Sequence, residues 1–159
     1  MISCYYKDIA EVECSWQGPC EDFETHLVSS HSVLEYTACK HNKIILELFL
    51  DLSSSGYRFV IISFVDNSLT QTCFFEEYFD EEAQIFKVLL RSANAQARGY
   101  KIAIQGKFST MEFGGCVQGF EESPIESSQQ CLQIFVPQIK RLAFIEENEL
   151  RYKVVISLV

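Results

Sequence analysis

Two cysteines and two histidines near the amino terminus place the strongest constraint on how this chain can fold. Cys4 and Cys14 are followed by His26 and His31, so the segment reads Cys-x9-Cys-x11-His-x4-His. Two thiolates and two imidazoles are a common ligand set for a tetrahedral structural zinc ion. The gap between Cys4 and Cys14 is longer than in common zinc fingers, where about two to four residues separate the two cysteines. The pattern nevertheless predicts that these four side chains bind one zinc ion.

A short helix is expected to carry both histidines. Glu21 and Asp22 are suited to its start, because acidic side chains accept hydrogen bonds from free backbone N–H groups and meet the positive end of the helix dipole. Phe23 and Leu27 are four residues apart and share one apolar face of such a helix. Trp16 is interpreted as the apolar centre of this small unit, with a ligand-binding aromatic residue as the alternative.

Other assignments of the same residue types stay open. The quartet could consist of unrelated side chains, since cysteine often serves as a small buried hydrophobic residue. Cys20 and His41 lie close enough in the sequence to be rival ligands. The cysteines outside the quartet are each expected to be buried or half-buried strand residues, namely Cys20, Cys39, Cys73, Cys116 and Cys131.

The composition narrows the class of protein. A chain of 159 residues with 48% hydrophobic residues suits one domain, or one domain plus a small metal-stapled unit. The net charge of −9 argues against a nucleic-acid partner, because phosphate binding depends on clustered Lys and Arg. Neither a membrane-spanning run nor a secretory signal is found in the sequence. The odd count of 7 cysteines favours a reducing compartment, the cytoplasm or also the nucleus.

Short runs rich in β-branched and aromatic residues follow the quartet. Clusters of Gly, Ser, Asn and Asp separate them, as is typical of strands joined by turns. The pattern predicts an all-β, antiparallel sandwich over residues 36–159, preceded by a small zinc finger with a short helix over residues 1–35. The expected strands are Ile44–Leu50, Tyr57–Val65, Ile85–Leu90, Tyr100–Phe108, Leu132–Val136 and Tyr152–Val159.

Several segments between these strands carry weaker signals. Gly114-Gly115 is expected to be a turn, and the acidic stretch 76–82 is expected to be a solvated loop. The alternative for the acidic stretch is a rim that attracts basic peptides. Residues 138–147 are expected to form a short helix or an irregular packed segment. The run 44–50 is apolar on both faces apart from Glu47, so it is either central in a sheet or a covered edge.

The sequence assigns no catalytic residue. Zinc held by four protein ligands keeps no open coordination position, so the predicted site is structural. His41 is the one histidine outside the quartet and is expected on the surface. The glycines lack the strand–loop–helix context of a phosphate-binding loop.

The residues around the quartet resemble a known family. Its motifs are Cys14-Ser15-Trp16-Gln17-Gly18-Pro19, then His26-Leu27-Val28 and His31. Together they are similar to the second zinc finger of the seven-in-absentia (Sina/Siah) family of ubiquitin ligases. Weaker similarities to the strands of that family follow in order at Phe79–Ala83, Gly99–Gly106 with Ser109-Thr110, Ser128–Leu132 and Tyr152–Leu158.

This resemblance implies a TRAF-like substrate-binding domain after the finger, with the quartet as zinc ligands. It also implies a homodimer and the capture of extended, degron-like peptides by strand addition. Two departures limit what carries over. No RING finger precedes Cys4 in this sequence, and Trp16 is the sole tryptophan, so the tryptophan beside the family's peptide groove has no match. The peptide-binding residues therefore stay unassigned.

The function expected from the sequence is a protein-interaction module that binds an extended peptide or a partner protein. One alternative is the substrate-recognition part of an active RING-type ubiquitin ligase. A second is a RING-less adaptor or competitor that does not promote ubiquitination. A third is a single-finger nucleic-acid binder, which the acidic charge disfavours.

Overall fold

A computed structural model describes residues 1–4, 13–38, 42–53, 55–66, 69–92, 98–106, 109–120, 125, 128–139, 144–146 and 149–159. Cys39 and His41, together with the predicted strand end Phe108, lie outside the described residues. No helix within the described ranges is long and apolar enough to cross a membrane.

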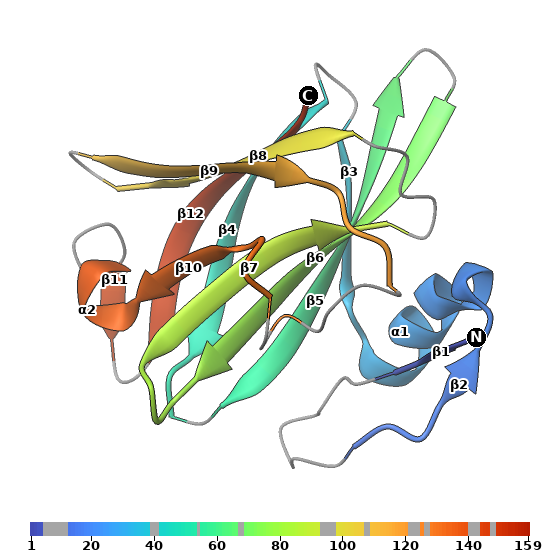
Figure 1. The fold of residues 1–159 in the computed structure, drawn as a ribbon, viewed down its shortest axis with the longest axis horizontal. Coiled ribbons are helices and arrows are strands. Elements are labelled where there is room, and N and C mark those ends of the chain that lie inside the picture. Colours follow the sequence, from blue (N-terminus) through green and yellow to red (C-terminus); the bar gives the residue numbers. More distant parts are fainter. Residues whose placement is uncertain are drawn as a thin grey trace.

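Two five-stranded sheets form an all-β sandwich, as predicted (Figure 1). Neighbouring strands are antiparallel, except that β3 runs parallel to β5. The first sheet has the order β10 (Leu132–Phe135), β7 (Ile85–Arg91), β6 (Leu69–Asp80), β5 (Gly56–Asp66) and β3 (Leu34–Ala38). The second sheet contains β4 (Lys43–Asp51), β12 (Glu149–Leu158), β8 (Gly99–Gln105) and β9 (Thr110–Cys116), with β11 (Phe144–Glu146) beside the start of β12.

A small amino-terminal unit lies beside the first sheet (Figure 1). It consists of β1 (Ile2–Ser3), β2 (Gln17–Gly18), the 3-10 turn η1 (Cys20–Asp22) and α1 (Phe23–His31). The helix ends where Ser32 adopts a left-handed backbone with φ of 50°. Strand β3 begins at Leu34 and so crosses residue 35, where the sequence placed the end of the finger. The division into two domains stays a prediction.

Alternating side chains from both sheets fill the core of the sandwich. Val60, Ile62 and Phe75 from the first sheet and Ile102 and Val154 from the second are at most 1% exposed. The second sheet keeps a solvent-facing outer side, which is visible in the alternating exposure of β9. The first sheet is covered on its outer side as well, by the amino-terminal unit and by Phe120, Ile125 and Cys131.

The acidic stretch 76–82 corrects the sequence prediction. It was expected to be a loop, but β6 includes its first five residues, and Glu76 and Glu77 are 0% exposed. An acidic rim at these two positions is therefore wrong too. An arginine accompanies each buried carboxylate: Arg58 donates from Nη2 to Glu77 at 2.9 Å, and Arg91 binds Glu76. Burial raises the pKa of Glu77, and Arg58 opposes that shift. Residues 81–84 do form the expected exposed turn.

Gly114 and Gly115 were expected to be a turn, and this prediction is wrong, because both lie inside β9. The space beside Gly115 is limited by two rings. A Cβ at Gly115 would lie 3.0 Å from Cε1 of Phe113 and 3.2 Å from Cζ of Tyr100 on β8, so a side chain there requires these rings to shift. Within residues 138–147, the structure describes the end of α2 (Val136–Ile139) and strand β11.

The apolar run 44–50 belongs to an edge strand. β4 pairs with β12 along its whole length, and no other described strand pairs with it. Leu46 and Leu48 point into the core and are at most 5% exposed. Ile45 and Phe49 are 53% and 45% exposed on the opposite face.

Candidate metal centre

Three short elements position the quartet. Cys4 directly follows β1, Cys14 lies shortly before β2, and both histidines are on α1. The antiparallel pairing of β1 with β2 brings the two cysteine-bearing segments together, and the N–H of Cys4 donates to the carbonyl of Trp16 at 3.0 Å. The predicted helix therefore exists and carries both histidines, with Phe23 and Leu27 buried on one side.

The four ligand atoms gather at one point. The Sγ atoms of both cysteines and a ring nitrogen of each histidine lie within 4.8 Å of one another. Cys4 Sγ is 3.5 Å from His31 Nε2, and Cys14 Sγ is 3.4 Å from His26 Nε2. Metal–sulfur bonds of about 2.3 Å and metal–nitrogen bonds of about 2.0–2.1 Å in a tetrahedron require S···N separations of about 3.5 Å. The quartet is therefore close enough to hold one metal ion.

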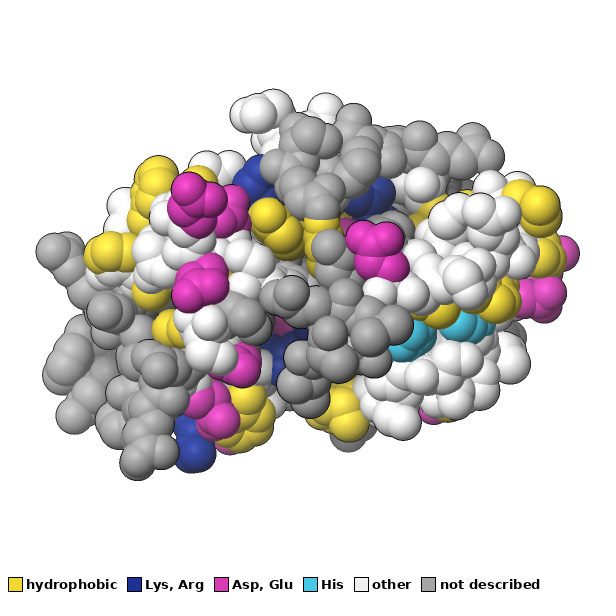
Figure 2. Space-filling model, turned by 90° about the horizontal axis from the view of Figure 1, so that it is seen from below, with side chains coloured by type: hydrophobic (Ala, Val, Ile, Leu, Met, Phe, Trp, Pro, Cys, Tyr) yellow, Lys and Arg dark blue, Asp and Glu magenta, His cyan; other side chains and the backbone are white. Residues whose placement is uncertain are grey.

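The surroundings of His26 favour metal binding. Burial and, to a smaller degree, the charge of His31 lower the pKa of His26, which favours the neutral imidazole that acts as a metal ligand. The indole of Trp16 stacks on the His26 ring with centroids 4.5 Å apart and planes 8° apart. In Figure 2 the histidine side chains lie side by side at the surface of the molecule.

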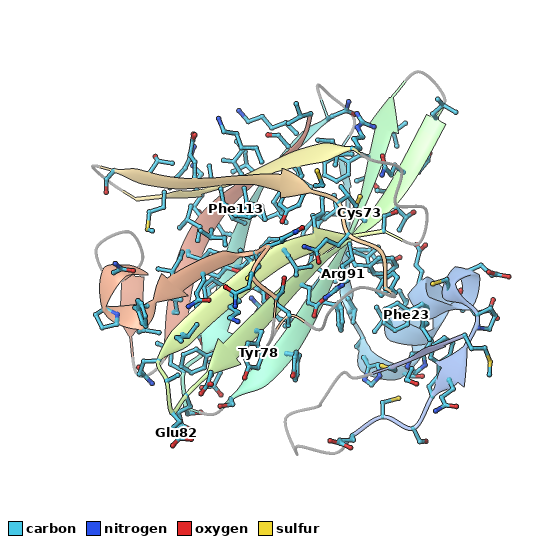
Figure 3. The ribbon with its side chains drawn as sticks, in the orientation of Figure 1. Phe23, Cys73, Tyr78, Glu82, Arg91 and Phe113 are labelled. Atoms are coloured by element: carbon cyan, nitrogen blue, oxygen red, sulfur yellow. The ribbon has the colours of Figure 1, made fainter. Side chains whose placement is uncertain are left out.

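Phe23 joins the metal-binding unit to the first sheet. Its ring is 0% exposed and lies 5.8 Å from Phe59 on β5, 5.5 Å from Phe74 on β6 and 5.0 Å from Phe120, measured between centroids. Figure 3 labels Phe23 at this junction. Cys4 and Phe23 belong to the same buried cluster as Phe59 and Phe74. The metal centre is thus packed onto the sandwich.

The described cysteines outside the quartet occupy other positions. Cys20 is half-buried in η1 and not in a strand. Cys73 is a buried strand residue, as predicted, and burial raises the pKa of its thiol to about 12. Burial also raises the pKa of Cys131, which lies just before β10. Cys116 is exposed at the end of β9, so the expectation of burial is wrong there.

A buried ion pair near the metal centre escaped sequence reasoning. Arg91 and Glu76 are 1% and 0% exposed, and Arg91 Nε donates to a Glu76 carboxylate oxygen at 2.6 Å. Arg91 Nη1 also donates to the carbonyl of Gly119 at 3.0 Å, next to Phe120. The pair therefore holds Gly119, whose neighbour Phe120 contacts Phe23. Figure 3 labels Arg91 and Phe23. The available signal was the aromatic-rich sequence on either side of Glu76, which is typical of a strand.

The fold and the quartet define an all-β protein with a Cys2His2 metal-binding cluster. No protein-family model matches the chain. No curated protein is significantly similar to it. The likeness to the seven-in-absentia family therefore depends on the sequence motifs.

Replacing Gly18 by Ala is expected to weaken metal binding. The added Cβ would lie 2.5 Å from Cζ2 of Trp16, so the indole, which stacks on the His26 ring, must shift. We expect a loss of about 1–3 kcal/mol in stability, typical of overpacking, and a faster release of metal to a chelator. Thermal melting and chelator kinetics measure both effects. Gly56→Ala is the control, because nothing lies within 4 Å of a Cβ there; equal behaviour of the two variants would contradict the proposed role of Trp16.

Proposed function

We propose that this chain is a protein-interaction module, in which a structural zinc ion holds a small finger against a β-sandwich that binds an extended peptide or a partner protein. The observation that carries the proposal is the Cys2His2 cluster, packed through Phe23 onto a sheet whose outermost strands, β3 and β10, each pair with one strand of the described residues. The motif around Trp16 resembles the substrate-binding part of seven-in-absentia ligases, and this resemblance supports the same function.

Zinc is the metal we propose for the quartet. Two thiolates and two imidazoles at tetrahedral spacing suit Zn²⁺, whereas magnesium and calcium prefer oxygen ligands. Four protein ligands leave no position for a substrate, so the ion has an architectural role. Because both thiols must stay reduced, the proposal places the chain in the cytoplasm or the nucleus.

Strand addition is the binding mode we propose. Each sheet ends in edge strands among the described residues, β3 and β10 in the first and β4, β9 and β11 in the second. An edge strand offers a row of backbone N–H and C=O groups to a further strand. Main-chain hydrogen bonds then supply affinity, and alternate side-chain positions of the peptide supply selectivity.

A display screen of extended peptides against the zinc-loaded chain tests this proposal. We expect binders that slow amide hydrogen exchange in one edge strand of a sheet. The matched controls are two versions of each binder, one with proline at the odd positions and one with proline at the even positions. Proline removes main-chain donors, so strand addition is abolished in the version whose prolines replace the residues that donate to the edge strand. Binders that protect no edge strand, or that tolerate proline at both the odd and the even positions, would count against the proposal.

Whether the chain acts within a ubiquitin ligase is tested separately from peptide binding. Co-purification of the intact cellular protein with a ubiquitin-transfer activity supports the substrate-recognition role. Co-purification with clients but without that activity supports the RING-less adaptor instead.

A further inference from the structure

The outer face of the second sheet contains a hollow of about 320 Å³. Its floor is formed by two small side chains, Val155 of β12 and Ala103 of β8, which are opposite each other and are 6% and 8% exposed. This volume is at the lower end of the range for small-molecule sites, about 300–1,000 Å³. Longer polar side chains complete the lining, namely Lys43, Lys101, Gln105, Thr110, Glu112 and Ser157.

Two lysines flank a hydroxyl group at one end of this hollow. Ser157 of β12 lies opposite Lys43 of β4 on one side and opposite Lys101 of β8 on the other. Because side chains alternate along a strand, all three residues share the outer face with Val155 and Ala103. Neighbouring strands are about 4.8 Å apart, so the two lysine Cα atoms are about 10 Å apart. Both flexible side chains therefore reach a group bound above Ser157.

The lysines give this end of the hollow a positive charge. Among the residues that the structure describes, none forms an ion pair with Lys43. Lys101 lies 3.0 Å from a carboxylate oxygen of Glu112, and both side chains are 52% exposed. A surface contact of this kind contributes little, so a more highly charged anion competes with it. Two ammonium groups against one carboxylate leave a net positive charge here, although the whole chain has a net charge of −9.

We infer that this hollow binds a small phosphate monoester, with the phosphate group between Lys43 and Lys101 and above the Ser157 hydroxyl. A phosphate monoester carries a charge of about −1.5 to −2 at neutral pH and has three strong acceptor oxygens. Two ammonium groups and one hydroxyl supply donors for all three oxygens and balance the charge. A carboxylate has one negative charge and two oxygens, so it uses the same donors less completely.

The other end of the hollow suits a ligand that carries hydroxyl groups. Gln105 of β8 lies opposite Thr110 of β9, and Glu112 follows on the same face of β9. An amide, a hydroxyl and a carboxylate are all partners for ligand hydroxyls. The C–H surface of the ligand then packs on Val155 and Ala103. The class of ligand is therefore a phosphorylated sugar or polyol.

This site goes beyond the proposed binding of an extended peptide. The hollow lies on the face of a sheet, whereas an added strand pairs with the edge of a sheet. Small-ligand binding is measured without any peptide, and peptide binding is measured without the ligand. Failure of one proposal is therefore distinguishable from failure of the other.

Isothermal titration calorimetry of the zinc-loaded chain tests the site with four probes, namely ribose 5-phosphate, glycerol 3-phosphate, inorganic phosphate and ribose. We expect the two monoesters to bind more tightly than inorganic phosphate, and ribose not to bind. Lys43→Gln and Lys101→Gln are each expected to weaken binding of the monoesters about tenfold, because each removes a charged hydrogen-bond donor.

Lys153→Gln is the matched control for these variants. Lys153 lies opposite Gln105 on the same sheet but does not line the hollow. At physiological ionic strength, where salt screens charges more than about 8 Å apart, we expect the control to keep the affinity of the parent protein within about twofold. The inference is overturned if neither monoester binds, if inorganic phosphate binds equally well, or if Lys153→Gln weakens binding as much as Lys43→Gln. Zinc content and circular dichroism confirm that every variant is folded.

Discussion

Replacing His26 by Ala is expected to unfold the unit formed by residues 1–31 and to lower the melting temperature of the sandwich. A structural zinc ion contributes about 10–16 kcal/mol of apparent binding free energy in zinc-finger peptides. This is comparable with the free energy of unfolding of a whole domain, which is about 5–15 kcal/mol. Without the metal, the small unit cannot keep Phe23 in place. Phe59 and Phe74 then lose the cover of the first sheet's outer face.

Native mass spectrometry and thermal melting check this expectation together. The parent protein should retain one zinc ion per chain, His26→Ala should retain none, and a chelator should convert the first into the behaviour of the second. Cys20→Ser is the matched control, because Cys20 is a cysteine of the same unit but lies outside the quartet. The metal assignment fails if His26→Ala binds zinc and melts like the parent protein, or if Cys20→Ser loses the ion.

Replacing Arg91 by Met is expected to cost about 3–5 kcal/mol of stability, because it leaves the buried carboxylate of Glu76 without its counter-charge. The variant also loses the hydrogen bond to the Gly119 carbonyl and so loosens Phe120. Since Phe120 contacts Phe23, we expect faster metal release as well as lower stability. Urea denaturation and chelator kinetics measure the two effects.

The paired variant Glu76→Met with Arg91→Met separates the charge from the packing. Exchanging both members of a buried ion pair for apolar side chains is often neutral, so this variant is expected to recover most of the stability. Lys101→Ala is the control for a surface pair: Lys101 and Glu112 are both 52% exposed, and their 3.0 Å contact contributes about 0–1 kcal/mol. Equal losses from Arg91→Met and Lys101→Ala would show that the buried pair has no special weight.

Residue chemistry made the quartet and the fold class predictable. Few side chains bind metals strongly, so Cys4, Cys14, His26 and His31 stood out by type and spacing alone. Runs such as 57–65 and 152–159 carry the β-branched and aromatic residues that favour strands. The predicted all-β fold is confirmed, and the quartet lies together as expected.

The missed features depend on contacts between distant residues. Glu76 and Glu77 indicate a solvated loop until Arg91 and Arg58, remote in sequence, are known to neutralise them. Gly115 indicates a turn until the rings of Phe113 and Tyr100 are known to leave little space for a side chain there. Such tertiary partners override local propensity, and no local pattern contains them.

Phe23 is synthesised before the side chains that bury it in the folded protein. A ribosome makes the amino-terminal unit first, yet the rings that enclose Phe23 belong to Phe59, Phe74 and Phe120, which emerge progressively later. A nascent chain can thus bring its four metal ligands together early, while the apolar surface around Phe23 is still exposed to water. During that interval a chaperone has a target that the finished molecule hides.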